Sequence, residues 1–155
     1  MNRNTLIIAL ISSLVGIHSM AHAQTSVTWS FASHKIGPRT FEVHLIAAVA
    51  PGDWHIYSQS TPKGGPLPTS ISFVNNPLVQ LIGTPKEIGK MHQVFDDVFG
   101  VDIRYFKDSV DFVEEVELKA NVKTQVSGSI KYMVCTDQEC QTPAPELFKV
   151  SIGGD

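Results

Sequence analysis

Beyond its first 23 residues, the chain has no apolar segment that approaches the roughly 20 residues required by a membrane-spanning helix. Positive charge is also scarce, because 12 Lys and Arg stand against 15 Asp and Glu, for a formal net charge of −3. The chain has no basic patch of the kind that binds nucleic acid, so no nucleic-acid partner is expected. No membrane span is expected after residue 23 either.

The recognisable motifs of several enzyme classes are missing. The chain has no P-loop, no dinucleotide-binding glycine fingerprint and no G-x-S-x-G nucleophile elbow. Asp96 and Asp97 are neighbours in the chain. Adjacent residues of a strand face opposite ways, which disfavours a paired-carboxylate glycosidase site. These patterns lead us to expect no cofactor.

Residues 1–23 have the pattern of a secretory signal. Arg3 precedes an apolar run from Leu6 to Ile17, and residues 21–23 have the Ala-x-Ala form of a cleavage site. Cleavage is expected after Ala23, which leaves residues 24–155 as a single exported domain. Such a domain would reach a compartment in which disulfides can form.

Residues 24–155 alternate between apolar and polar side chains in several segments, which is typical of half-buried antiparallel strands. The clearest segments are 27–31, 41–49, 126–134 and 148–152. Stretches rich in Pro, Gly or Asn separate them, and no segment has a convincing helical stripe. The pattern therefore predicts an all-β fold, an immunoglobulin-like β-sandwich. Residues 94–100 break the alternation and are expected to form a strand junction or an exposed loop.

Cys135 and Cys140 are the only two cysteines of the chain. A bond between them would close a loop of about six residues, for which the chain-entropy model gives a stabilisation of only about 2 kcal/mol. Two thiols at this spacing can instead form and resolve a mixed disulfide without large movement. The spacing therefore favours a redox centre, while a structural staple stays open as the alternative.

The residues between the two cysteines are acidic. Asp137 and Glu139 lie in this loop, and neither Lys nor Arg does. Nearby negative charge disfavours a thiolate, so local sequence alone does not predict strongly acidic thiols. We therefore expect slow, selective exchange inside a docked complex.

A soft copper site is a further alternative. Cys135, Cys140 and Met133 could provide sulfur ligands, together with His55 or His92. A structural zinc site is disfavoured, since it generally requires four Cys or His ligands at recognisable spacing. No metal is expected on balance.

Three motifs carry a resemblance to a known family. They are Pro51–Ser58 (PGDWHIYS) followed by Gly64–Thr69, then Asp96–Gly100 (DDVFG), then Tyr132–Cys135 with Cys140 and the prolines after it. In this order and spacing they resemble the N-terminal periplasmic domain of the thiol:disulfide interchange protein DsbD. The resemblance spans nearly all of residues 24–155.

The resemblance implies a periplasmic domain with an immunoglobulin-like fold that relays electrons. The domain would accept them from a thioredoxin-like donor and pass them to oxidised periplasmic proteins. Because the membrane portion and the thioredoxin-like domain of full-length DsbD are not found in this sequence, the donor is expected to be a separate protein. The alternative from another functional class is an exported β-sandwich that binds a partner and uses its disulfide only to fix a recognition loop.

The resemblance also assigns roles by position. Cys135 and Cys140 would be the redox pair, and Cys140 would form the bond to the partner. Tyr57 would pack beside the cysteines, and Phe99 would shield them. The cap loop that carries this shield would consist of Asp96, Asp97, Val98, Phe99 and Gly100.

Overall fold

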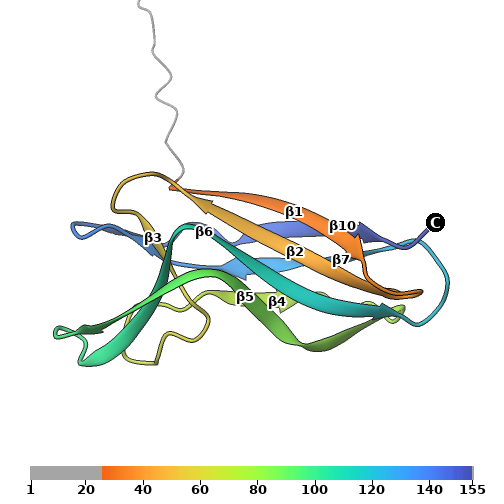
Figure 1. The fold of residues 1–155 in the computed structure, drawn as a ribbon, viewed down its shortest axis with the longest axis horizontal. Coiled ribbons are helices and arrows are strands. Elements are labelled where there is room, and N and C mark those ends of the chain that lie inside the picture. The colour runs from red at the N-terminus through yellow and green to blue at the C-terminus, as the bar shows by residue number, and fades with distance from the viewer. Residues whose placement is uncertain (1–25, 155) are drawn as a thin grey trace, which may run out of the picture.

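The computed structural model describes residues 26–154, and all of the regular structure in that range is β-strand (Figure 1). The predicted signal and its cleavage site after Ala23 lie outside the described residues. Within residues 26–154, no helix is long and apolar enough to cross a membrane.

The strands form two antiparallel sheets. The larger sheet has seven strands, and its spatial order is β1 (Val27–Lys35), β2 (Thr40–Val49), β6 (Val101–Leu118), β3 (His55–Tyr57), β8 (Val134–Cys135) and β9 (Cys140–Gln141), with β5 (Val79–Asp96) also paired to β6. The smaller sheet has the order β10 (Glu146–Ile152), β7 (Thr124–Lys131) and β4 (Ser70–Phe73). The predicted all-β sandwich is confirmed.

The main core lies between the two sheets. In β2 every second residue is buried, as the alternation of the sequence predicted. The residues of β7 and β10 that face β2 and β6 are buried with the same period. Burial of each large apolar side chain contributes roughly 1.5–3 kcal/mol. The largest completely enclosed members of this core are Leu45, Ile56, Phe106, Phe112, Leu118, Ile130 and Ile152.

The small sheet owes its close packing to a glycine. A Cβ atom placed on Gly128 in β7 would lie 2.1 Å from the backbone oxygen of Ser72 and 2.5 Å from the ring of Phe148. Real Cβ atoms do not approach other atoms so closely. The absence of a side chain at this position therefore lets β4 and the Phe148 ring pack against β7.

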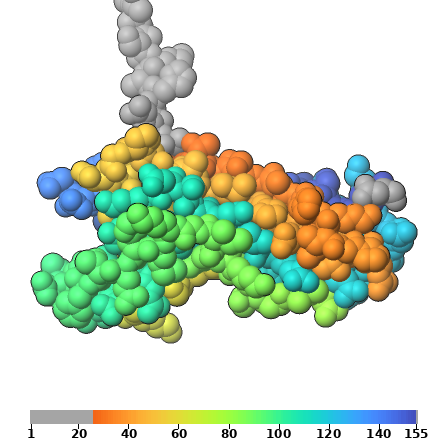
Figure 2. Space-filling view, viewed as in Figure 1, coloured from red at the N-terminus to blue at the C-terminus, as the bar shows by residue number. Residues whose placement is uncertain are grey.

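β6 is the central strand of the molecule and changes partner along its length. Its residues Ser109–Glu117 pair with β2, and Tyr105 and Phe106 pair with β3. Asp108, between these two parts, has a φ of 64°. The opposite edge of β6 pairs with β5, and the tip of this long hairpin projects from the body of the sandwich (Figures 1 and 2).

The predicted strand 126–134 is in fact two strands in different sheets. β7 ends at Lys131 in the small sheet, and Val134 begins β8 in the large sheet. Tyr132 and Val134 are both buried in the main core, so the alternation continues although the chain changes sheet. This crossing places Cys135 beside β3.

Candidate functional site

A short hairpin between β8 and β9 brings the two cysteines together. The backbone N–H of Thr136 donates to the carbonyl of Glu139 at 2.8 Å. The Thr136 hydroxyl oxygen accepts from the backbone N–H groups of Gln138 and Glu139, each at 3.1 Å. These bonds fix a tight turn, so that Cys135 and Cys140 lie directly opposite each other on adjacent strands.

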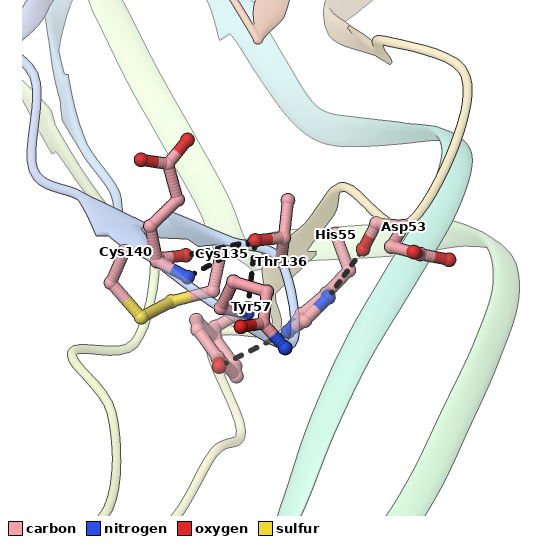
Figure 3. The surroundings of a disulfide bond; sticks show 8 residues. Asp53, His55, Tyr57, Cys135, Thr136 and Cys140 are labelled. Carbon is pink, nitrogen blue, oxygen red and sulfur yellow. Dashed lines mark hydrogen bonds between the residues drawn. A yellow bond between two sulfur atoms is a disulfide. The ribbon is translucent and has the colours of Figure 1, made fainter.

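Cys135 and Cys140 form a disulfide, with their Cα atoms 4.1 Å apart (Figure 3). The two residues differ sharply in exposure, because Cys135 is only 1% exposed whereas Cys140 lies at the surface. A large partner can therefore reach the bond from the side of Cys140. Cys135 stays inside the protein.

The buried cysteine belongs to a small cluster on the outer face of the large sheet. Tyr57, Ile103 and Cys135 are its buried members, with Val101, Tyr105 and Met133 packed against them; we call these six residues the site cluster. Side chains alternate between the two faces of a strand. The strand neighbours Ile56 and Val134 therefore point into the main core, while Tyr57 and Cys135 point the other way.

His55 connects the site cluster to the loop before β3. Its Nδ1 lies 3.1 Å from the carbonyl oxygen of Asp53, and its Nε2 lies 3.1 Å from the Tyr57 hydroxyl. A carbonyl only accepts, so Nδ1 carries the proton and donates it to Asp53. In neutral His55, Nε2 is then the acceptor and the Tyr57 O–H is the donor. Figure 3 shows this chain of bonds next to the disulfide.

Burial perturbs the titration of both members of this chain. Desolvation is the largest influence on His55 and lowers its pKa, with the charge of Lys107 acting in the same direction. Desolvation also raises the pKa of Tyr57, and the negative charge of Asp96 raises it further. Near neutral pH, His55 is therefore an uncharged base and Tyr57 keeps its proton.

An open pocket of about 380 Å³ exposes the disulfide to solvent. Cys140 lines it together with the aromatic residues His55, Tyr57 and Tyr105 and with residues from the β5–β6 hairpin. Lys107 and the acidic Asp137 also lie on its wall, so the pocket has both signs of charge.

The predicted cap residues form the turn at the tip of the β5–β6 hairpin. The Asp96 carboxylate accepts from the backbone N–H groups of Val98 at 2.8 Å and Phe99 at 3.1 Å. Gly100 donates to the Asp96 carbonyl at 2.7 Å and has a φ of 68°, a conformation that favours glycine. Residues 94–96 are the end of β5 and residues 97–100 are an exposed turn that leads into β6, so both expectations for residues 94–100 apply.

Only part of this turn lines the pocket that contains Cys140. Phe99 and Asp96 line the pocket beside Cys140, and Phe99 is 48% exposed. Val98 is 89% exposed, and both Val98 and Asp97 lie outside the lining of the pocket. Phe99 is therefore the aromatic residue of the turn that lines the pocket of Cys140.

Sequence reasoning considered His55 only as a metal ligand and did not single out Tyr105 or Lys107. A signal for His55 existed, because His55 and Tyr57 are two residues apart on one strand and so share a face. Within residues 26–154, no group of three or more His, Cys, Asp or Glu side chains is placed to hold a metal ion. Of the proposed copper ligands, the two sulfurs of the cysteines are bonded to each other.

The structure is similar to two solved domains. One is the reduced form of the N-terminal domain of DsbD from Neisseria meningitidis, with 17% identity, a TM-score of 0.52, and coverage of 83% of this chain and 87% of that chain. The other is the N-terminal periplasmic domain of ScsB from Proteus mirabilis, with 17% identity, a TM-score of 0.45, and coverage of 81% of this chain and 44% of that chain. The first similarity confirms the immunoglobulin-like form of the sandwich.

No curated protein matches the chain. Residues 24–152 match the family model described as thiol:disulfide interchange protein DsbD, N-terminal. This match covers most of the chain and includes both cysteines, the hairpin turn and β3. The chain therefore belongs to the DsbD N-terminal domain family.

Proposed function

We propose that residues 24–155 form a periplasmic domain that exchanges thiols and disulfides with other proteins through Cys135 and Cys140. The observation that carries this proposal is the asymmetry of the disulfide, in which a surface cysteine is bonded to a buried one at an open pocket. Membership of the DsbD N-terminal family supports a thiol–disulfide exchange domain. The signal pattern of residues 1–23 supports export, with cleavage after Ala23.

The different environments of Cys140 and Cys135 give the two cysteines different steps in the proposed exchange. In the reduced protein, the Cys140 thiolate attacks one sulfur of a partner disulfide, and the other partner sulfur leaves as a thiolate. Cys135 then attacks Cys140 Sγ, which forms the internal disulfide and releases the second partner thiolate. Two electrons pass to the partner in total. A thioredoxin-like donor restores the reduced state in two steps. One donor thiolate attacks Cys140, and Cys135 leaves as a thiolate; the second donor thiol then attacks the donor sulfur of the mixed disulfide, which releases Cys140 and leaves the donor as a disulfide.

The direction of flow in this proposal is from the donor to oxidised periplasmic proteins. The donor is a separate thioredoxin-like protein or a membrane-bound reductase of the DsbD type, and the clients are exported proteins with reducible disulfides. The turn Asp96–Gly100 acts as a cap in which Phe99 covers the pocket until a partner docks. Support for this role comes from the position of Phe99 on the pocket wall beside Cys140.

Trapping of mixed disulfides with single-cysteine variants tests the proposal. Cys135→Ala keeps the exposed thiol but removes the thiol that resolves the intermediate, so it should accumulate covalent complexes with periplasmic proteins on non-reducing gels. Cys140→Ala is the matched control, because its remaining thiol is buried and should capture little. The reaction should use the mature domain and a periplasmic extract, followed by mass spectrometry of the complexes.

Two results would favour the alternative, a binding module with a structural disulfide. One is the absence of any covalent complex with either variant. The other is a reduction potential below about −300 mV, which is typical of structural bonds that resist reduction.

A further inference from the structure

The burial of Cys135 creates a problem of proton transfer. In each cycle of the proposed exchange, Cys135 must lose a proton to attack Cys140 and must regain it when a donor breaks the bond. Its surroundings are the largely apolar site cluster, and burial of this kind disfavours a thiolate. A group that accepts and returns the proton would therefore accelerate both steps.

His55 and Tyr57 are placed to do this. His55 lies directly opposite Cys135 in the pairing of β3 with β8, and Tyr57 packs with Cys135 in the site cluster. The Tyr57 hydroxyl donates to His55 Nε2 at 3.1 Å, and the bond from Nδ1 to Asp53 fixes the tautomer that leaves Nε2 free to accept. In Figure 3 the Tyr57 ring lies beside the disulfide, and its hydroxyl points to His55.

We propose that Tyr57 and His55 form a proton relay for Cys135, in which the Tyr57 hydroxyl exchanges a proton with the sulfur and His55 accepts or supplies it. This proposal rests on the proposed function, because it assigns the acid and base of that exchange. It gives His55 a role that depends on Tyr57, which belongs to the same buried cluster as the reacting cysteine.

The relay balances in both directions. When Cys135 resolves a mixed disulfide, its S–H proton passes to the Tyr57 oxygen while the Tyr57 proton passes to His55 Nε2. The Cys135 sulfur then bonds to Cys140 Sγ, and the bond from Cys140 to the partner breaks, with the electron pair leaving on the partner sulfur. When a donor thiolate attacks Cys140, Cys135 leaves with the electron pair, and the imidazolium of His55 returns the proton through Tyr57.

The charged groups around His55 set the pH at which the relay works. Lys107 of β6 opposes protonation of His55, whereas Asp53 before β3 and Asp137 in the β8–β9 turn favour it. Tyr105 of β6 packs against the His55 ring, with centroids 4.6 Å apart. Desolvation outweighs the other influences and lowers the pKa of His55, so the base form is present at neutral pH and is lost in acid.

Stopped-flow reaction of the reduced, mature domain with 5,5′-dithiobis(2-nitrobenzoic acid) separates the two steps. Attack by the exposed Cys140 releases one thionitrobenzoate in a phase that depends on reagent concentration. Attack by Cys135 releases the second in a first-order phase. General acid–base catalysis contributes on the order of 100-fold or more to a rate. We expect His55→Gln and Tyr57→Phe to slow the first-order phase at least about tenfold at pH 7, with less than about twofold change in the bimolecular phase.

The pH profile distinguishes a relay from a packing defect. Above the pKa of an ordinary cysteine, about 8.5, the thiol ionises increasingly without help, so the rates of both variants should approach that of the wild type as pH rises. His92→Gln is the matched control, because His92 stacks on Tyr105 but, among the described residues, forms no hydrogen bond with His55 or Tyr57, and its first-order rate should be unchanged. Thermal unfolding of each oxidised variant identifies any that is misfolded.

Two results would overturn the relay: equal first-order rates in wild type, His55→Gln and Tyr57→Phe from pH 6 to 8, or a rate deficit that stays constant as pH rises. Failure of the proposed function would be seen differently. In that case the wild-type domain itself would release only one thionitrobenzoate or fail to reduce protein disulfides.

Discussion

The two faces of the large sheet use the same strands for different purposes. The inner face contributes to the main core, which lies between the two sheets. The outer face carries the site cluster, of which only Tyr57, Ile103 and Cys135 are buried. Because adjacent residues of a strand face opposite ways, β3 supplies Ile56 to the core and Tyr57 to the site. The residues that stabilise the domain and those of the proposed chemistry are therefore neighbours in the sequence, but they lie on opposite faces of the sheet.

This separation explains how a reactive disulfide can open and close in a small domain. The bond joins two short strands at the edge of the sheet, and the main core includes only the strand neighbour Val134 from this hairpin. We therefore expect that breaking the bond leaves the facing surfaces of the two sheets in place. A disulfide that joined the sheets through the core would couple each redox cycle to the stability of the whole domain.

The two faces should differ most in the free energy of unfolding that is lost when one large side chain on each face is replaced by alanine. Phe112→Ala removes a completely buried ring from the main core and should lower the free energy of unfolding by about 3–5 kcal/mol. Ile103→Ala removes a side chain from the small site cluster. Because this side chain lines an open pocket, its loss should lower the free energy of unfolding by about 2 kcal/mol or less. Urea unfolding of the oxidised protein measures both values. Equal losses would mean that the two faces form one cooperative core and that the comparison fails.

The inner face was easier to predict from the sequence than the strands that carry the site. β2, β7 and β10 alternate between buried residues and residues that are partly or fully exposed, and the first part of β1 does so more weakly, so period-two alternation is visible. β5 is exposed along most of its length and has register shifts at Ile82/Lys86 and Gly89/Met91, which remove the pattern. In β6, Phe112, Val113 and Glu114 are buried in succession because strands pair with both edges and side chains pack on both faces.

The site was predictable only where it depends on local sequence. The spacing of Cys135 and Cys140 indicated a bond, and the resemblance located the turn at Asp96–Gly100. The environment of His55 was not predictable, because it arises from the pairing of β3 with β8, two short strands far apart in the chain. The split of residues 126–134 between sheets was also hidden, since both pieces keep the same alternation.

Glu114 is an exception to the division between the faces, and it yields a pH-dependent prediction. Its side chain is 1% exposed and lies on the inner face with Phe112 and Val116. Neither carboxyl oxygen has a hydrogen bond of good geometry among the described residues, although the Ile82 backbone lies close enough to oppose the desolvation in part. Desolvation raises its pKa in the folded state. A raised pKa means that Glu114 favours folding below its ordinary pKa of about 4.3, and that this contribution is lost as pH rises through the folded value.

Replacement of Glu114 by methionine should therefore stabilise the domain in neutral and alkaline solution. We expect a gain on the order of 1 kcal/mol at pH 8, since apolar residues of similar volume often replace buried charges favourably. The gain should shrink toward pH 4, where the glutamic acid is neutral. Glu115→Met is the matched control, because Glu115 is only partly buried and points to the other face. Equal effects of both substitutions across pH would contradict the placement of the Glu114 charge.

The smallest effect on stability, and a distinct effect on reactivity, is expected at the tip of the hairpin. Phe99 is about half exposed and contributes to neither the main core nor the site cluster. Phe99→Ala should change the free energy of unfolding by less than about 0.5 kcal/mol, as surface substitutions usually do. Removal of the ring should still speed reduction of the disulfide by glutathione severalfold, because the ring lies on the wall of the pocket that contains Cys140.

Val98 provides the control for this prediction. Val98 is the next residue in the same turn and is far more exposed, but it lies outside the pocket. Val98→Ala should leave the glutathione rate unchanged, so a difference between the two variants would isolate the position of the ring from the flexibility of the turn. If Phe99→Ala reacted no faster than the wild type, Phe99 would not be a shield. Protection of the disulfide from small thiols would then have to come from the burial of Cys135 alone. The outer face would in that case exclude reagents by burial of a side chain, as the inner face excludes water from the main core.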